Sequence, residues 1–266
     1  MAAPLKLLFL NPVGIPDYDQ FFAQSLQPWL QPGTELHVAS LPPEDGCFSH
    51  LEYRAYEGRV TSGIVRAARA GAVEGFDAMV IGCFYDPALQ DAREISGTMA
   101  VTAPCIASCE IAVSLSNRFG IIVGRPKWVP QMRAAVYDYG YADQLTGFYS
   151  VDMTVVEFQR DHAETERRLL EAGRRAVEED HAEALILGCT MEIGFHRKLE
   201  DKLGVPVIDP SIAAVKRAEY AARLKRDCGW IPSRKWSCEP PPESELARFG
   251  GFETNRVFGH RVSVFR

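Results

Sequence analysis

The stretch "FDAMVIGC" (residues 76–83) places a run of apolar residues between an acidic residue and a Gly-Cys pair. A short apolar run bounded in this way is typical of a strand that is buried on both faces of a parallel sheet. The polar turn and helix predicted after it, in residues 84–94, make it the first half of a βα unit. "AEALILGC" (residues 182–189) repeats the pattern far enough along the chain for each copy to lie in its own half of a duplicated protein.

The same alternation runs through most of the sequence. Further strands are predicted at residues 5–10, 35–41, 104–108, 118–124, 145–151 and 205–210. Amphipathic helices are predicted at residues 56–73, 126–140, 161–180, 193–204 and 211–227, where apolar residues recur at helical spacing. This order predicts an α/β fold with parallel sheets and right-handed crossovers, in which ligands bind at the carboxyl ends of the strands.

The repeated Gly-Cys segments divide the chain into two pseudo-symmetric lobes. We expect each lobe to be a parallel sheet flanked by helices, with the active site in the cleft between them. Residues 1–103 plus 208–229 would form the first lobe, and residues 104–207 the second. Residues 230–266 are rich in Pro, Gly, Arg and aromatics without a sustained period, and form a C-terminal extension expected to cover the cleft or a neighbouring subunit.

Composition limits the class of protein. The chain has 266 residues, 47% of them hydrophobic, and a formal net charge of -6, which argues against a nucleic-acid partner. No apolar stretch approaches the roughly 18 residues of a membrane span, and no cleavage signal follows the first apolar run, so a cytoplasmic location is expected. Seven scattered cysteines do not resemble a disulfide framework, and the lone Cys105-x3-Cys109 pair does not indicate a metal site.

The two Gly-Cys pairs suggest acid/base chemistry. A thiol at the end of a strand, beside the first N–H groups of a helix, is expected to have a lowered pKa. One such thiol can equally be structural, but two in matching positions suit a reaction that needs a base on each face of a substrate. A thiolate can remove the proton alpha to a carbonyl while N–H donors hold the enolate, and an opposite thiol can return a proton. The predicted outcome is racemisation.

Four segments carry a resemblance to a known family. They are "FLNPVG" (9–14), "GCFYDPALQDARE" (82–94), "LILGCTMEIG" (185–194) and "GVPVIDPSIAAVKRAE" (204–219). Together they resemble the aspartate/glutamate racemase superfamily, and within it the hydantoin racemase branch, which includes allantoin racemases. The resemblance implies a two-domain α/β enzyme that needs no cofactor or metal, acts on a hydantoin or related cyclic ureide, and assembles as a homo-oligomer.

The resemblance also implies roles for individual residues. Cys83 and Cys189 would be the catalytic acid/base pair, and Asn11, in the first strand-to-helix turn, would help to hold the ring. The full set of expected substrate-binding residues is Asn11, Pro12, Phe84, Tyr85, Gly124, Arg125, Thr190 and Met191.

Departures from the family pattern leave the substrate open. Val13 and Gly14 replace polar residues after the first strand, and Arg125 follows the strand at 118–124, where it could pair with a substrate carboxylate or cap a surface loop. "CTME" replaces the usual "CAGM", so Met191 and Glu192 would crowd or charge the cleft. The segment "PPEDGCFSHLEYR" (42–54) introduces Cys47 and His50, which receive no role.

Other activities stay open at this point. An amino-acid racemase is one alternative, and a maleate isomerase, which would also use two cysteines, is another. An arylmalonate decarboxylase needs only the second thiol, so Cys83 counts against it. A binding protein that keeps the cleft without catalysis is a further alternative, although two matching thiols argue against it.

Overall fold

The computed structural model describes residues 3–46 and 48–266, so Cys47 lies outside the described residues. The chain forms two compact units, each built around its own sheet. The first unit consists of the described residues up to Gly82, together with Pro87–Ala103 and Val215–Arg266. The second consists of Cys83–Asp86 and Pro104–Ala214. The chain therefore enters the second unit briefly, for four residues that begin at Cys83.

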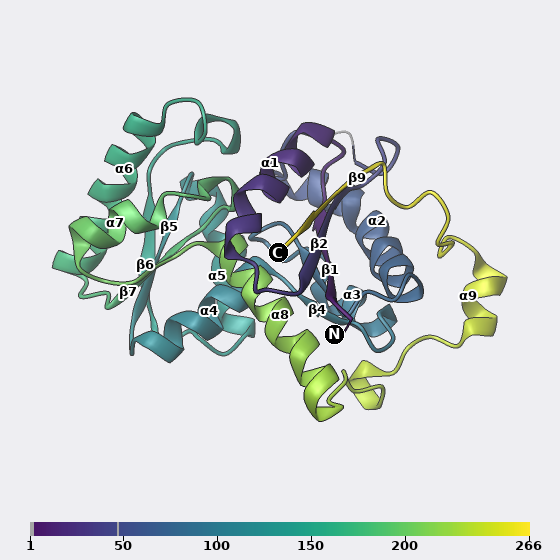
Figure 1. Cartoon of the computed structure of the whole chain (residues 1–266). Coiled ribbons are helices and arrows are strands. Elements are labelled where there is room, and N and C mark those ends of the chain that lie inside the picture. Colours follow the sequence, from purple (N-terminus) through teal and green to yellow (C-terminus); the bar gives the residue numbers. More distant parts are fainter. Residues whose placement is uncertain (1–2, 47) are drawn as a thin grey trace. The chain divides into compact units, whose positions relative to one another are not determined.

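The sheet of the first unit has five strands in the order β4-β3-β1-β2-β9. Four of them are parallel, and β9 is antiparallel to β2 (Figure 1). The central strand β1 is buried apart from Lys6, because strands lie on both sides of it and helices flank the sheet. The strands are β1 (Leu5–Asn11), β2 (Thr34–Ser40), β3 (Ala78–Ile81), β4 (Ala100–Thr102) and β9 (His260–Phe265). The helices are α1 (Pro16–Leu26), α2 (Arg54–Val73), α3 (Leu89–Ile95), most of α8 (Pro210–Cys228) and α9 (Glu243–Phe249).

The sheet of the second unit has four parallel strands in the order β6-β5-β7-β8. The continuous apolar runs of β5 and β7 are completely buried, as predicted for central strands. The strands are β5 (Phe119–Val123), β6 (Leu145–Ser150), β7 (Ala184–Leu187) and β8 (Val207–Ile208). The helices are α4 (Pro104–Leu115), α5 (Val129–Asp138), α6 (His162–Arg174), which continues as a π-helical turn, and α7 (His196–Leu203).

These sheets confirm the predicted α/β class with two sheets of parallel strands flanked by helices. One prediction was wrong: residues 104–108 are not a strand but the start of α4, and the strand lies at Ala100–Thr102 instead. Pro104 suits the first turn of a helix, where its missing N–H is not needed. The side chain of Asp86 accepts hydrogen bonds from the next two N–H groups, of Cys105 and Ile106.

The C-terminal extension contains a strand that was not predicted. Its six residues, His260–Phe265, pair along the whole of β2, from Ser40 to Glu35. Alternating Val262 and Val264 are a weak local signal, and the strand forms because a distant edge of the sheet accepts it.

Among the described residues, no helix has the length and hydropathy needed to span a membrane.

Candidate active site

Cys83 lies just after the end of β3, and Gly82 separates it from the strand. The Gly82 N–H donates to the carbonyl oxygen of Leu10 on β1 at 2.7 Å. A Cβ at Gly82 would lie 2.4 Å from the Phe9 ring and 2.9 Å from that same oxygen, so only glycine fits here. The Cys83 thiol that follows is partly exposed.

Asp86 connects the Cys83 loop to helix α4 of the second unit. Its carboxylate accepts from the N–H groups of Cys105 at 2.8 Å and Ile106 at 2.9 Å, and from the Tyr139 hydroxyl at 2.9 Å. Its backbone is in the left-handed region, with φ at 49°, a conformation that aspartate adopts more readily than most residues. Three residues after the thiol, the chain is therefore held by charged hydrogen bonds at the N-terminus of α4.

Cys189 follows β7 in the same way. The Gly188 N–H donates to the carbonyl oxygen of Ile122 on β5, again at 2.7 Å, and a Cβ at Gly188 would lie 2.5 Å from that oxygen. In each Gly-Cys pair the glycine follows the strand and packs closely against the neighbouring strand. The likeness of the two sequence segments corresponds to a likeness in local structure.

The side chain of Glu192 is buried and contacts Cys189. It closes a capping box around the short 3₁₀ turn Thr190–Glu192: its carboxyl accepts from the Cys189 N–H at 3.0 Å, and its own N–H faces the Cys189 side chain. That N–H also donates to the Cys189 carbonyl at 3.0 Å. Burial raises the pKa of Glu192 well above its usual range, and nearby Asp209 raises it further. This shift of the pKa favours the uncharged form of the Glu192 carboxyl, whose oxygen accepts the Cys189 N–H.

The remaining predicted residues of the second unit lie at neighbouring strand ends. Gly124 and Arg125 follow β5, and Thr190 and Met191 follow β7, which is paired with β5. Gly124 is required by close packing, because a Cβ would lie 2.4 Å from the Met153 carbonyl oxygen and from the Trp128 ring. Parallel pairing therefore brings these residues to one edge of the sheet, while Phe84 and Tyr85 come from the Cys83 loop.

Asn11 and Pro12 lie in the first unit, at the end of β1. Asn11 is 3% exposed, and its amide is engaged within the unit: Nδ2 donates to Asp19 Oδ1 at 3.2 Å, and Oδ1 accepts from the Val13 N–H at 3.4 Å. Gly14, the departure from the family pattern, is explained by packing, since a Cβ there would lie 2.2 Å from the Gly46 carbonyl oxygen.

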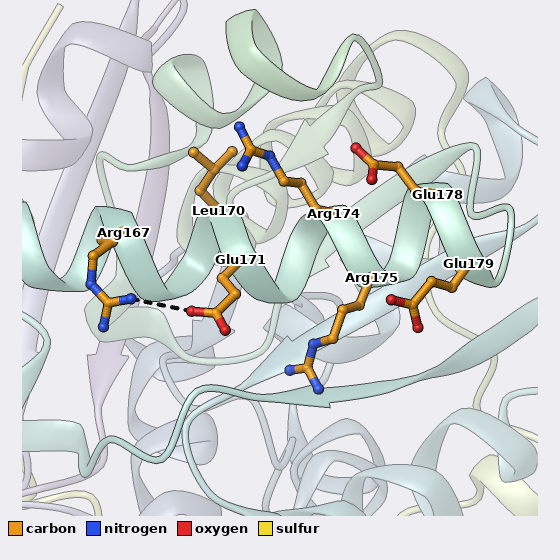
Figure 2. A pocket seen from close by; sticks show the side chains of 7 residues that line it. All are labelled: Arg167, Leu170, Glu171, Arg174, Arg175, Glu178 and Glu179. Carbon is orange, nitrogen blue, oxygen red and sulfur yellow. Dashed lines mark hydrogen bonds and ion pairs between the residues drawn. The ribbon is translucent and has the colours of Figure 1, made fainter.

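A surface hollow along α6 is separate from all these residues. Figure 2 shows that its lining comes from one helix and its π-helical continuation, with charged side chains of both signs and an ion pair of 3.2 Å between Arg167 and Glu171. It contains none of the predicted site residues. Across the described part of the chain, no group of three or more His, Cys, Asp or Glu side chains is placed to hold a metal ion.

Comparison with known proteins identifies the family of this chain. The sequence profile of the family described as Asp/Glu/Hydantoin racemase matches residues 7–218. The chain belongs to this family. It is accordingly an enzyme, an isomerase of the racemase type. Residues 219–266, which include β9, lie beyond the part that the family profile matches.

Individual members of the racemase family show the same relationship. The hydantoin racemase of Rhizobium meliloti is 37% identical over 69% of this chain and 75% of its own, and that of Pseudomonas sp. (strain NS671) is 34% identical over 72% and 77%. The structure of allantoin racemase from Klebsiella pneumoniae superposes with a TM-score of 0.80 at 26% identity, covering 90% of this chain and 94% of that one.

Three acidic residues form hydrogen bonds with predicted site residues, Asp19 with Asn11, Asp86 with Cys83 and Glu192 with Cys189. Of the three, only Glu192 was predicted at the site, where it was expected to crowd or charge the cleft. Each is at most 6% exposed. Asp86 and Glu192 lie three residues after Cys83 and Cys189, a shared spacing that the sequence already contained.

Proposed function

We propose that this enzyme is a cofactor-independent racemase of a hydantoin-like cyclic ureide, with Cys83 and Cys189 as its two acid/base groups. The observation that carries the proposal is the matched construction of the two Gly-Cys pairs, each with a glycine N–H bonded at 2.7 Å to the neighbouring strand. The names of the relatives, hydantoin racemase and allantoin racemase, support a ring substrate.

In the proposed reaction one cysteine is a thiolate and the other a thiol. The thiolate takes the proton from the carbon alpha to the carbonyl, and the electron pair left behind enters the carbonyl as an enolate. The opposite thiol then donates its proton to the other face of that carbon, and the enolate returns to the carbonyl. One proton leaves and one arrives, so the ring is inverted at this carbon without net change in composition.

The surroundings of Cys189 suit this role. The Glu192 N–H faces its side chain at the start of a 3₁₀ turn, and an N–H donor at such a position favours the charged form of a thiol. Burial raises the pKa of Glu192 and favours its uncharged form, which would not oppose a thiolate beside it.

The substrate-binding residues of the proposal are those expected from the sequence. Asn11 and Pro12 would hold the ring, Phe84 and Tyr85 would cover it, and Gly124, Arg125, Thr190 and Met191 would line the second strand ends. Arg125 is half-buried and would bind a carboxylate or another polar substituent of the ring. This role favours a hydantoin with a polar substituent over one with a simple alkyl group at C5.

Deuterium exchange tests the proposal directly. Each enantiomer of several 5-substituted hydantoins, and of allantoin, is incubated with enzyme in deuterated water, while proton NMR follows the ring C–H and polarimetry follows optical rotation. We expect wild-type enzyme to exchange the proton and racemise both enantiomers, and Cys83→Ala and Cys189→Ala each to abolish racemisation. Cys228→Ala, at an exposed thiol, is the matched control and should behave as wild type. Full racemisation by either single variant would refute the two-base assignment.

A further inference from the structure

The last strand of the chain brings a histidine to the carboxyl edge of the first sheet. Because β9 is antiparallel to β2, its first residue, His260, pairs with the last residue of β2, Ser40. Ligands of α/β proteins bind at this edge of a sheet. His260 lies beyond the residues that the family profile matches.

His260 contacts a buried carboxyl group of α1. Its Nδ1 lies 2.9 Å from Asp19 Oδ2, and Asp19 is completely buried although His260 keeps 40% of its side chain exposed. Burial raises the pKa of Asp19, while the hydrogen bonds from His260 and Asn11 act in the opposite direction. A buried carboxyl group needs hydrogen-bond partners, and His260 is one of the partners of Asp19 in this position.

The other oxygen of Asp19 accepts from Asn11. Asn11 Nδ2 donates to Asp19 Oδ1 at 3.2 Å and to the Ile15 carbonyl at 3.5 Å, while Asn11 Oδ1 accepts from the Val13 N–H at 3.4 Å. The amide therefore holds together the turn at residues 11–15. Its orientation depends on having an acceptor at Asp19.

We propose that His260, acting through Asp19, is a positioning residue for Asn11 and the turn at residues 11–15, and thereby for substrate binding. The link to substrate rests on the proposed function, in which Asn11 and Pro12 hold the ring. Residues outside the family-matched part of the chain would then tune the site of the racemase.

The experiment compares three variants of the full-length enzyme. His260→Ala removes the contact, and His260→Asn restores a donor close to the position of Nδ1. Arg261→Ala is the matched control, since it removes a side-chain ion pair to Glu74 from the next residue of the same strand. His260→Gln, whose amide cannot occupy the Nδ1 position, replaces His260→Ala if that variant does not fold.

Two measurements are made on each variant. Amide hydrogen exchange of residues 11–15 in the free enzyme reports the order of the turn, and steady-state kinetics with a racemised hydantoin give kcat and KM separately. We expect His260→Ala to lose exchange protection in the turn and to raise KM about tenfold, the size of one hydrogen bond to a charged group, with a smaller change in kcat. His260→Asn should restore both values, and Arg261→Ala should change neither.

The possible failures are distinguishable. Unchanged exchange in His260→Ala would overturn the positioning role whatever the activity. Altered exchange with an unchanged KM would overturn the link to substrate while leaving the racemase proposal intact. If wild-type enzyme acted on none of the hydantoins, the proposed function would be overturned, and the exchange measurement alone would decide whether His260 orders the turn.

Discussion

Replacing Asp86 by alanine should separate the Cys83 loop from helix α4. The substitution removes the acceptor of two N–H groups at the N-terminus of α4 and of the Tyr139 hydroxyl. Loss of a helix N-cap costs about 1–2 kcal/mol, loss of a hydroxyl bond about 1 kcal/mol, and alanine in a left-handed conformation about 1 kcal/mol. The expected loss is thus about 3–4 kcal/mol, a large share of the roughly 5–15 kcal/mol that stabilises a folded domain.

Urea unfolding at 25 °C, followed by circular dichroism, measures this loss. Asp86→Asn should cost less, about 1–2 kcal/mol, because its amide oxygen still accepts one N–H and asparagine tolerates the left-handed region. Tyr139→Phe should cost about 1 kcal/mol, and the double variant with Asp86→Ala should cost less than the sum of the two, since the same bond is lost in both. In the racemase assay Asp86→Ala should lose more activity than Tyr139→Phe, because it frees the chain next to Cys83.

Two results would refute this reasoning. A loss below 1 kcal/mol in Asp86→Ala would show that the carboxylate does not hold α4. Full additivity in the double variant would show that Asp86 and Tyr139 do not act on each other.

Two further predictions concern the second strand end. Burial raises the pKa of Glu192 above its usual 4.5, so the folded state holds a proton that the unfolded state releases, and the stability contributed by this group falls as the pH rises above 4.5. Glu192→Gln removes this loss, and urea unfolding at pH 5 and pH 8 should show a smaller decrease in the free energy of unfolding than in wild type; an equal decrease would contradict a raised pKa at Glu192. Gly188→Ala should lower the free energy of unfolding by about 1–3 kcal/mol through its clash with the Ile122 carbonyl, whereas an equal loss in Gly58→Ala, where a Cβ meets open space, would show that the clash is not the cause.

The sequence predicted the elements whose signal is local. Strands β5 and β7 are continuous apolar runs, and their burial on both faces follows from that pattern alone. The start of α4 was mistaken for a strand because residues 104–109 are apolar or small throughout and show no clear period. What decides between the two is the carboxylate of Asp86, which reaches the helix from a distant part of the chain. Strand β9 was missed for a related reason, since only its pairing with β2 stabilises it.

The candidate site was predicted where residue type and spacing carry the chemistry. Both Gly-Cys pairs were recognised because the pattern repeats, and the structure adds the reason for each glycine. Glu192 was expected to crowd or charge the cleft, but Asp19 and Asp86 were not predicted, because an acidic residue in a sequence is expected on the surface. Burial raises the pKa of Glu192, and Asp19 becomes the shared partner of Asn11 and His260, only through packing that brings segments together.

The pairing of β9 with β2 has a consequence for synthesis on the ribosome. The first sheet joins residues 35–40 to residues 260–265, so it cannot be completed until residues 260–265 have left the exit tunnel. The second sheet draws all its strands from residues 119–208 and is available earlier. Although nascent chains generally fold from the N-terminus, we expect the second sheet of this protein to be completed first, while the strands of the first sheet still lack β9.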